Sequence, residues 1–184
     1  MEFATVNLRE FGLGPRHTVD DTTYGGGDGM LLRIEPLVAA IEFAKRSTPG
    51  ARILLMTPSE NLWSQKMAMA HAQSNDDYII VCGHYEGFDA RIEDYVDEKI
   101  SIGCYVLTGG EVPAMVVVDS IVRLIPGVLG GETSAEIESY SDVATLEYPQ
   151  YTRPEIFRGQ RVPEILLSGD HAKIAKWRAD HSIK

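Results

Sequence analysis

The residues that decide the fold of this chain read SIGCYVLTGGEVP, from Ser101 to Pro113. A strand-like core, Tyr105 to Leu107, lies between a single glycine, Gly103, and the pair Gly109 and Gly110. Glycines at the ends of a strand let the backbone approach a ligand closely. Their uncovered amide and carbonyl groups suit a planar ligand with polar edges, such as an adenine. The simpler alternative is that Gly109 and Gly110 only form a turn.

Apolar segments that precede this stretch predict a parallel sheet. Ile53–Met56 and Tyr78–Cys82 are continuously apolar, as strands buried on both faces are, and predicted helices over Pro36–Ser47 and Leu62–Gln73 alternate with them. Thr5–Leu8 is a further candidate strand. We therefore predict an α/β fold in which helices cover both faces of a parallel sheet.

Polar or glycine residues follow all three predicted strands. They are Thr57 and Pro58 after the first, Gly83–Gly87 after the second and Thr108–Gly110 after the third. Parallel sheets of this kind bind ligands at the carboxyl ends of their strands. The sequence therefore predicts one pocket built from three loops.

Two other segments carry local signals. The loop Gly12–Asp28 is long for a structureless connection, and such loops are usually functional or disordered. Its run of glycines at Gly25–Gly29 suits a phosphate, but no Gly-Lys-Ser/Thr follows, so it is not a P-loop; the alternative is a flexible hinge. Pro113–Leu124 is amphipathic and predicts a helix that ends before Pro126.

Composition favours a globular protein. The chain has 184 residues, 44% of them hydrophobic, which is enough for a core. The longest apolar runs are about five residues, too short to span a membrane, and the N-terminus does not resemble a signal peptide. Cys82 and Cys104 are isolated, and the histidines lack metal-ligand spacing, so we expect a cytoplasmic protein without a metal site.

Charge is unevenly distributed along the chain. The net charge is −10, which argues against binding nucleic acid through bulk electrostatics. Residues 75–100 hold eight acidic and two basic side chains, whereas residues 151–184 hold seven basic and four acidic ones. We expect any polyanionic partner to bind the C-terminal third, although ordinary solvated faces explain the charges equally well.

A change in composition after Gly130 predicts the domain boundaries. The polar stretch Glu132–Asp142 has no apolar periodicity. We therefore predict one domain over residues 1–130, a linker over 131–150 and the start of a helical region over 151–184, with a helix beginning at Ser168–His171.

Several sequence blocks together resemble the bacterial tRNA (guanine-N1-)-methyltransferase family, part of the SPOUT superfamily of knotted methyltransferases. In family order they are Thr18–Asp21 with Tyr24–Gly27, Cys82–Gly87, Ser101–Pro113, Arg123–Gly130, Tyr148–Pro154 and Val162–Arg178. A single block is modest evidence, but the ordered set spans nearly the whole chain and is highly specific.

The resemblance implies more than the residue patterns do. It implies a deep trefoil knot in the α/β domain, S-adenosyl-L-methionine bound in that knot, and a homodimer with active sites at the interface. The implied reaction is methylation of N1 of the guanosine at nucleotide 37 of tRNA, next to the anticodon. Magnesium dependence is implied by the resemblance alone, with Glu86 as the candidate ligand.

The resemblance also assigns site residues. Glu138 holds the position of the catalytic base, Asp142 is the alternative base, and Arg123 holds the position of the arginine that stabilises charge at O6 of the guanine. The implied cofactor contacts are Met56, Thr57, Pro58, Gly83, Tyr85, Glu86, Ile102, Gly103, Tyr105, Leu107, Gly109, Gly110 and Pro113.

Some positions depart from the family pattern. Cys104 and Glu138 each stand where the family usually has aspartate, and the family's first strand and helix and much of its C-terminal domain are expected to lie outside Val6–Lys184. Two alternatives therefore remain. One is a SPOUT enzyme that methylates a ribose hydroxyl, against which the blocks at residues 24–27 and 151–154 argue. The other is a truncated, catalytically silent homologue that binds the cofactor or RNA.

Overall fold

We describe residues 2–59, 61–129 and 146–182 of the protein from a computed structural model. The chain forms two compact units, Met1–Ile125 and Pro126–Lys184, and each is described by itself. The predicted boundary at residue 130 and most of the predicted linker lie outside the described residues, so this division of the chain stays a prediction.

The first unit is built on a parallel three-stranded sheet. Its strands are β3 (Arg52–Met56), β4 (Tyr78–Cys82) and β5 (Glu98–Ile100), in the order β4-β3-β5. β3 pairs along its whole length with β4, and Leu54–Met56 pair with β5. The predicted parallel sheet and its first two strands are therefore confirmed.

Alternate side chains of the central strand β3 enter two separate cores. Ile53 and Leu55 belong to one buried cluster, and Leu54 and Met56 belong to the other. All four are almost fully buried, because successive side chains of a strand point to opposite faces and both faces of this sheet are covered. The continuous apolar run in the sequence results from this two-sided burial.

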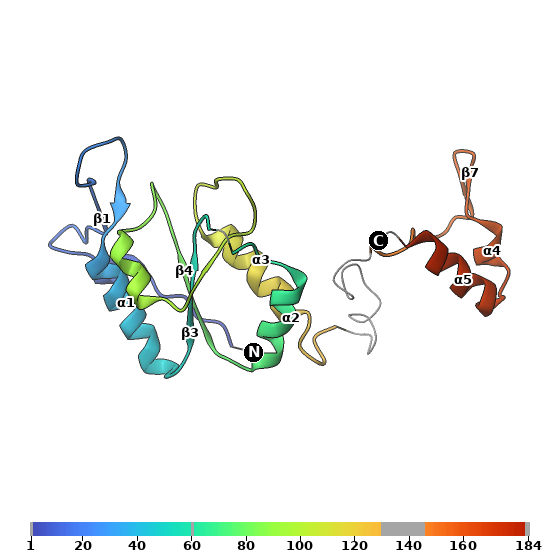
Figure 1. Cartoon of the computed structure of the whole chain (residues 1–184), viewed down its shortest axis with the longest axis horizontal. Helices are drawn as coiled ribbons and strands as arrows, with labels where there is room; N and C mark the ends of the chain where they lie inside the picture. Colours follow the sequence, from blue (N-terminus) through green and yellow to red (C-terminus); the bar gives the residue numbers. More distant parts are fainter. Residues whose placement is uncertain (1, 60, 130–145, 183–184) are drawn as a thin grey trace. The chain divides into compact units, whose positions relative to one another are not determined.

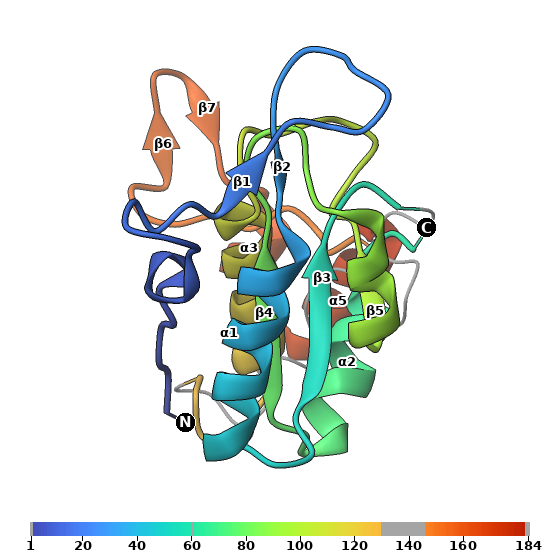
Figure 2. The same cartoon turned by 90° about the vertical axis from the view of Figure 1, so that its left-hand side faces the viewer.

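Helices cover both faces of the sheet, as predicted. In Figures 1 and 2, α1 (Ile34–Ser47) lies on one face, and α2 (Gln65–Ser74) and α3 (Glu111–Val122) lie on the other. The Ser64 side chain caps α2 by accepting a hydrogen bond from the Met67 amide, so that helix begins three residues later than predicted.

The third predicted strand is wrong. Tyr105 lies in a bend, Val106 and Leu107 have no regular secondary structure, and the strand at that edge of the sheet is β5. The Ser101 hydroxyl accepts a hydrogen bond from the Gly103 amide and donates one to the Gly103 carbonyl, which turns the chain away from the sheet. Val106 is consequently 85% exposed, and the segment cannot pair as a buried strand.

The N-terminal part of the chain also differs from the prediction. Thr5–Leu8 is not a strand; Asn7 caps a short 3-10 helix, η1 (Leu8–Phe11). β1 (Asp20–Asp21), inside the long loop, pairs antiparallel with β2 (Leu31–Leu32), which follows the loop. The loop between β1 and β2 therefore closes a hairpin, and its glycines at residues 25–27 and 29 have the positive φ angles that glycine tolerates.

Hydrogen bonds join this hairpin to the loop that follows β4. The Leu32 amide donates to the Gly87 carbonyl, and the Asp89 amide donates to the Leu32 carbonyl. A second 3-10 helix, η2 (Ala90–Tyr95), follows and buries Ile92 in the core on the α1 side. The hairpin is thus fixed at its base, whereas the side chain of Tyr24 in its loop is fully exposed.

The second unit combines a hairpin with helices. Strands β6 (Ile156–Phe157) and β7 (Gln160–Arg161) pair antiparallel, and α4 (Glu164–Leu167) and α5 (His171–His181) follow. Asp170 caps α5 by accepting a hydrogen bond from the Lys173 amide. The predicted helix start is confirmed, and the hairpin was not predicted. Nowhere in the described residues is there a helix long and apolar enough to cross a membrane.

Candidate functional site

A pocket lies where the carboxyl ends of the three strands meet. Its walls come from the ends of β3 and β4, from the loop between β5 and α3, and from the first turn of α3. The cavity measures about 180 Å³, more than ten times the room that one water molecule needs, so it admits an organic group. The prediction of one pocket built from three loops is confirmed.

Backbone hydrogen bonds hold the three loops together. The Gly110 amide donates to the Gly83 carbonyl at 2.8 Å, and the Thr57 amide donates to the Ile100 carbonyl at 3.1 Å. His84 and Gly109 also form an isolated antiparallel bridge. The pocket is therefore a defined feature of the first unit.

Every predicted cofactor contact lies in the wall of this pocket. The residues are Met56, Thr57, Pro58, Gly83, Tyr85, Glu86, Ile102, Gly103, Tyr105, Leu107, Gly109, Gly110 and Pro113. The structure thus brings together residues from four segments of the sequence. Their contact with a cofactor stays a prediction.

The pocket is also lined by residues that were not among the predicted cofactor contacts. They are His84, Gly87, Phe88, Ile100, Ser101, Val106 and Thr108. All of them lie beside predicted residues in the same strand-end segments, so adjacency was the available signal. Phe88 has a structural role too, because its ring lies 2.7 Å from where a side chain on Gly83 would begin.

The two glycines of the pair have different surroundings. A Cβ on Gly110 would lie 2.6 Å from the Gly83 nitrogen and 2.8 Å from the Cys82 Cα, both of which are backbone atoms. A Cβ on Gly109 would instead meet the ends of the Glu111 and His84 side chains. Neither glycine has a positive φ. Close packing between two loops therefore explains Gly110.

A strained turn presents Tyr85 and Glu86 at the pocket. The Gly87 amide donates to the His84 carbonyl at 3.1 Å, and Tyr85 between them has a φ of 58°, which is uncommon for a residue with a bulky side chain. The Glu86 amide donates to the Met30 carbonyl, which anchors the turn to the N-terminal hairpin. Strain of this kind is often found at functional sites.

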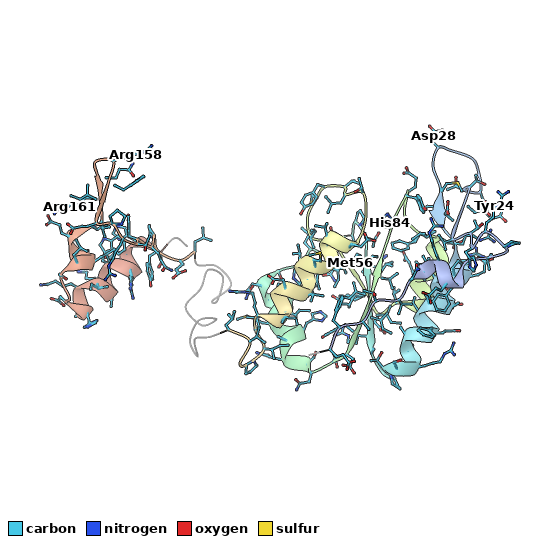
Figure 3. The ribbon with its side chains drawn as sticks, turned by 180° about the vertical axis from the view of Figure 1, so that it is seen from behind. Tyr24, Asp28, Met56, His84, Arg158 and Arg161 are labelled. Carbon is cyan, nitrogen blue, oxygen red and sulfur yellow. The ribbon has the colours of Figure 1, made fainter. Side chains whose placement is uncertain are left out.

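Burial makes the thiol of Cys82, the last residue of β4, unreactive. Burial, with a smaller contribution from the Glu111 carboxylate, raises the pKa of the Cys82 thiol to about 11. The thiol therefore stays protonated near neutral pH and does not act as a nucleophile. Figure 3 labels Met56 and His84, which do line the pocket.

Arg123, the predicted catalytic residue that the structure describes, does not line this pocket. Arg123 is half-buried and follows the last turn of α3, whereas Pro113 in the first turn lines the pocket. Ten residues separate them along the helix, which corresponds to a rise of about 15 Å. Glu138 and Asp142 lie outside the described residues.

Metal ligands do not gather in the described part of the chain. Residues 2–59, 61–129 and 146–182 contain no group of three or more histidine, cysteine, aspartate or glutamate side chains that could hold a metal ion. The structure therefore gives no support to Glu86 as a magnesium ligand.

The parallel sheet and the glycine-lined pocket at its strand ends define an α/β domain of the kind that binds organic cofactors. Comparison with known proteins identifies the family. A family model described as tRNA (Guanine-1)-methyltransferase TrmD matches residues 1–184. The chain belongs to this family, and the resemblance seen in the sequence is confirmed.

Curated relatives agree with this assignment. A tRNA (guanine-N(1)-)-methyltransferase from Geobacillus kaustophilus is 49% identical over 185 residues, covering 100% of this chain and 75% of that protein. Proteins of the same name from Halalkalibacterium halodurans (50% identical over 186 residues, 100% of this chain and 75% of the relative) and Myxococcus xanthus (51% over 178 residues, 97% and 72%) are similar to the chain as well.

Proposed function

We propose that this protein methylates N1 of the guanosine at nucleotide 37 of tRNA, with S-adenosyl-L-methionine as the methyl donor. Family membership supports the reaction class, because relatives with about half of their residues identical carry the name tRNA (guanine-N(1)-)-methyltransferase. The observation that carries the proposal is the convergence of every predicted cofactor residue on one pocket.

The chemistry of the pocket fits this cofactor. Met56, Ile102 and Leu107 give it apolar walls that suit a purine ring. Tyr85 and Glu86 offer an aromatic ring and a carboxylate, which suit a sulfonium cation. When bound, the cofactor supplies an electrophilic methyl group on its sulfur.

We also propose that the first unit contains the trefoil knot of its family. On one side of the segment 101–110, the Ser101 amide donates to the Asn61 carbonyl and the Trp63 amide donates to the Ser101 carbonyl. On the other side, the Gly110 amide donates to the Gly83 carbonyl. Contact of this one segment with two earlier loops supports the proposal, because a knotted chain must pass through an earlier loop.

The proposed chemistry needs a base and a cation. The N1 proton of guanine has a pKa roughly two units above neutral, so a carboxylate must remove it before the nitrogen can attack. We assign this role to Glu138, with Asp142 as the alternative, and we assign Arg123 to the negative charge that develops at O6. Because Arg123 lies far along α3 from the pocket, we propose that these groups act at the pocket of the partner subunit.

A dimer through α3 is consistent with the surface of that helix. Val117 and Ile121 are buried against the sheet, whereas Val112, Met115 and Val116 are exposed. Burying a valine or methionine side chain stabilises an association by roughly 1.5–3 kcal/mol, so a second copy of this face is a suitable partner.

The hairpin of the second unit has features that suit RNA. Ile156 and Phe157 are exposed, and the Arg158 guanidinium lies 5.3 Å from the centre of the Phe157 ring. Within residues 146–182, Arg158 has no ion-pair partner, whereas Arg161 pairs with Glu155 at 2.8 Å. An arginine next to an aromatic ring can contact both phosphates and unstacked bases, so we assign this hairpin to tRNA binding. We propose that this binding takes place in the cytoplasm.

A methyl-transfer assay tests the proposal. We expect labelled methyl groups to pass from S-adenosyl-L-methionine to a tRNA transcript with guanosine at nucleotide 37, and not to a matched transcript with adenosine there. Nuclease digestion of the product should give 1-methylguanosine. Cofactor binding without transfer would favour the catalytically silent alternative, and a methylated ribose would favour the other SPOUT reaction.

A further inference from the structure

A hydrogen bond joins two side chains beside the pocket. The Nε2 atom of His84 lies 2.6 Å from the Oε1 atom of Glu111. His84 follows β4 and lines the pocket, and Glu111 is the first residue of α3, directly after the pocket residue Gly110. The two side chains therefore connect two walls of the pocket that lie far apart in the sequence.

The lack of a side chain at Gly109 leaves room for His84 and Glu111 to meet. A Cβ on Gly109 would lie 2.6 Å from the Oε2 atom of Glu111 and 3.1 Å from the Cε1 atom of His84. The absence of a side chain at Gly109 thus leaves the space in which the pair forms. Glu111 lies in the first turn of α3, where an acidic side chain interacts favourably with the helix dipole.

We propose that His84 and Glu111 form a latch that holds residues 108–110 against the loop after β4 and so strengthens cofactor binding. This inference rests on the proposed function of the pocket. Ordering a loop on binding costs free energy, and a contact that orders the loop beforehand raises affinity. His84 and Glu111 are positioning residues in this account, since they act through the backbone of residues 108–110.

Exposure limits the size of the effect. The His84 and Glu111 side chains are 53% and 57% exposed, and exposed ion pairs are weakened by water and salt. We expect loss of the latch to weaken cofactor affinity by about two- to fivefold, and by less at high salt.

Calorimetry with S-adenosylhomocysteine tests the latch through a double-mutant cycle. His84→Gln and Glu111→Gln should each weaken binding, the double variant should be no weaker than either single one, and His84→Arg should keep the parent's affinity because arginine also pairs with a carboxylate. Glu93→Gln is the matched control. This change breaks the 3.0 Å ion pair between Lys99 and Glu93, whose side chains are 43% and 55% exposed. It should leave the affinity for S-adenosylhomocysteine unchanged.

Hydrogen exchange tests the latch without any cofactor. The Gly110 amide, which donates to the Gly83 carbonyl, should exchange faster in His84→Gln and Glu111→Gln than in the parent and in Glu93→Gln. Unchanged exchange, or fully additive effects on affinity, would overturn the latch. If the parent binds no S-adenosylhomocysteine, the proposed function fails, and the exchange rates still decide whether the latch exists.

Discussion

Replacing Gly110 by alanine should destabilise the first unit strongly. The new Cβ would lie 2.6 Å from the Gly83 nitrogen, 2.8 Å from the Cys82 Cα and 3.1 Å from the Cys82 carbonyl carbon. Backbone atoms within a sheet end cannot rotate away, so the two loops must separate. Overpacking costs about 1–3 kcal/mol, and weakening the hydrogen bond from Gly110 to Gly83 adds about 0.5–1.5 kcal/mol. We expect the free energy of unfolding to fall by about 1.5–4.5 kcal/mol.

Gly109→Ala is the matched control for this prediction. Its Cβ would meet the Glu111 and His84 side-chain ends, which can move, and the backbone φ is not positive at either glycine. We expect a loss of less than about 1 kcal/mol there. Urea unfolding followed by circular dichroism measures both values. The packing argument is wrong if the free energy of unfolding of Gly110→Ala stays within about 0.5 kcal/mol of the parent's. It is also wrong if the two variants have the same free energy of unfolding.

Met115 is 70% exposed on the apolar face of α3, and replacing it by glutamate places a charge there. Light scattering should then show a monomer, and this monomer should no longer transfer methyl groups. A persistent dimer would reject this interface. Glu138→Gln should slow methyl transfer about 100- to 10,000-fold in a single-turnover assay while S-adenosylhomocysteine affinity stays the same, and a parental rate would reject Glu138 as the base. Arg158→Ala should weaken tRNA binding in a filter assay and should lower the slope of binding against salt concentration by about one counterion. Arg161→Ala should change that slope less, because Arg161 is already paired with Glu155. Equal slopes for the two variants would contradict the assignment. Burial lowers the pKa of His71 below 6.5, so the free energy of unfolding should fall as the pH decreases below 6.5 and through the folded-state pKa. His71→Gln should flatten that decline in urea titrations. An unchanged slope would mean that another group causes the decline.

The sheet was predictable where burial leaves a clear pattern. β3 and β4 are apolar at almost every position because both faces are covered, and the sequence shows this directly. β5 has no such pattern, since it is only three residues long and begins with Glu98 and Lys99. Glu98 is accommodated because its carboxylate accepts hydrogen bonds from Arg52 and Asn61, which a sequence cannot show.

The composition of Tyr105–Leu107 was misleading for a physical reason. Aromatic and β-branched residues favour strands when a pleated, half-buried surface receives them. Here the turn at Ser101–Gly103 carries the segment away from the sheet, and its side chains are largely exposed. The location of the pocket was still predicted correctly, because Thr108–Gly110 follow the third strand whether that strand ends at Ile100 or at Leu107.

The cofactor site and the catalytic groups differ in how far they can be assigned. Contacts to a cofactor come from consecutive loops at one edge of a sheet, so a strand pattern places them within a single unit. Arg123 is placed by the length of α3 instead: the helix begins at the pocket and ends about 15 Å away, farther than an arginine side chain reaches. In the proposed mechanism the pocket therefore binds the methyl donor without Arg123, and the arginine that stabilises charge on the guanine comes from another subunit. The exposed face of α3 offers a way to supply it, because a dimer formed there would bring a second copy of the helix, and a second Arg123, to the same assembly.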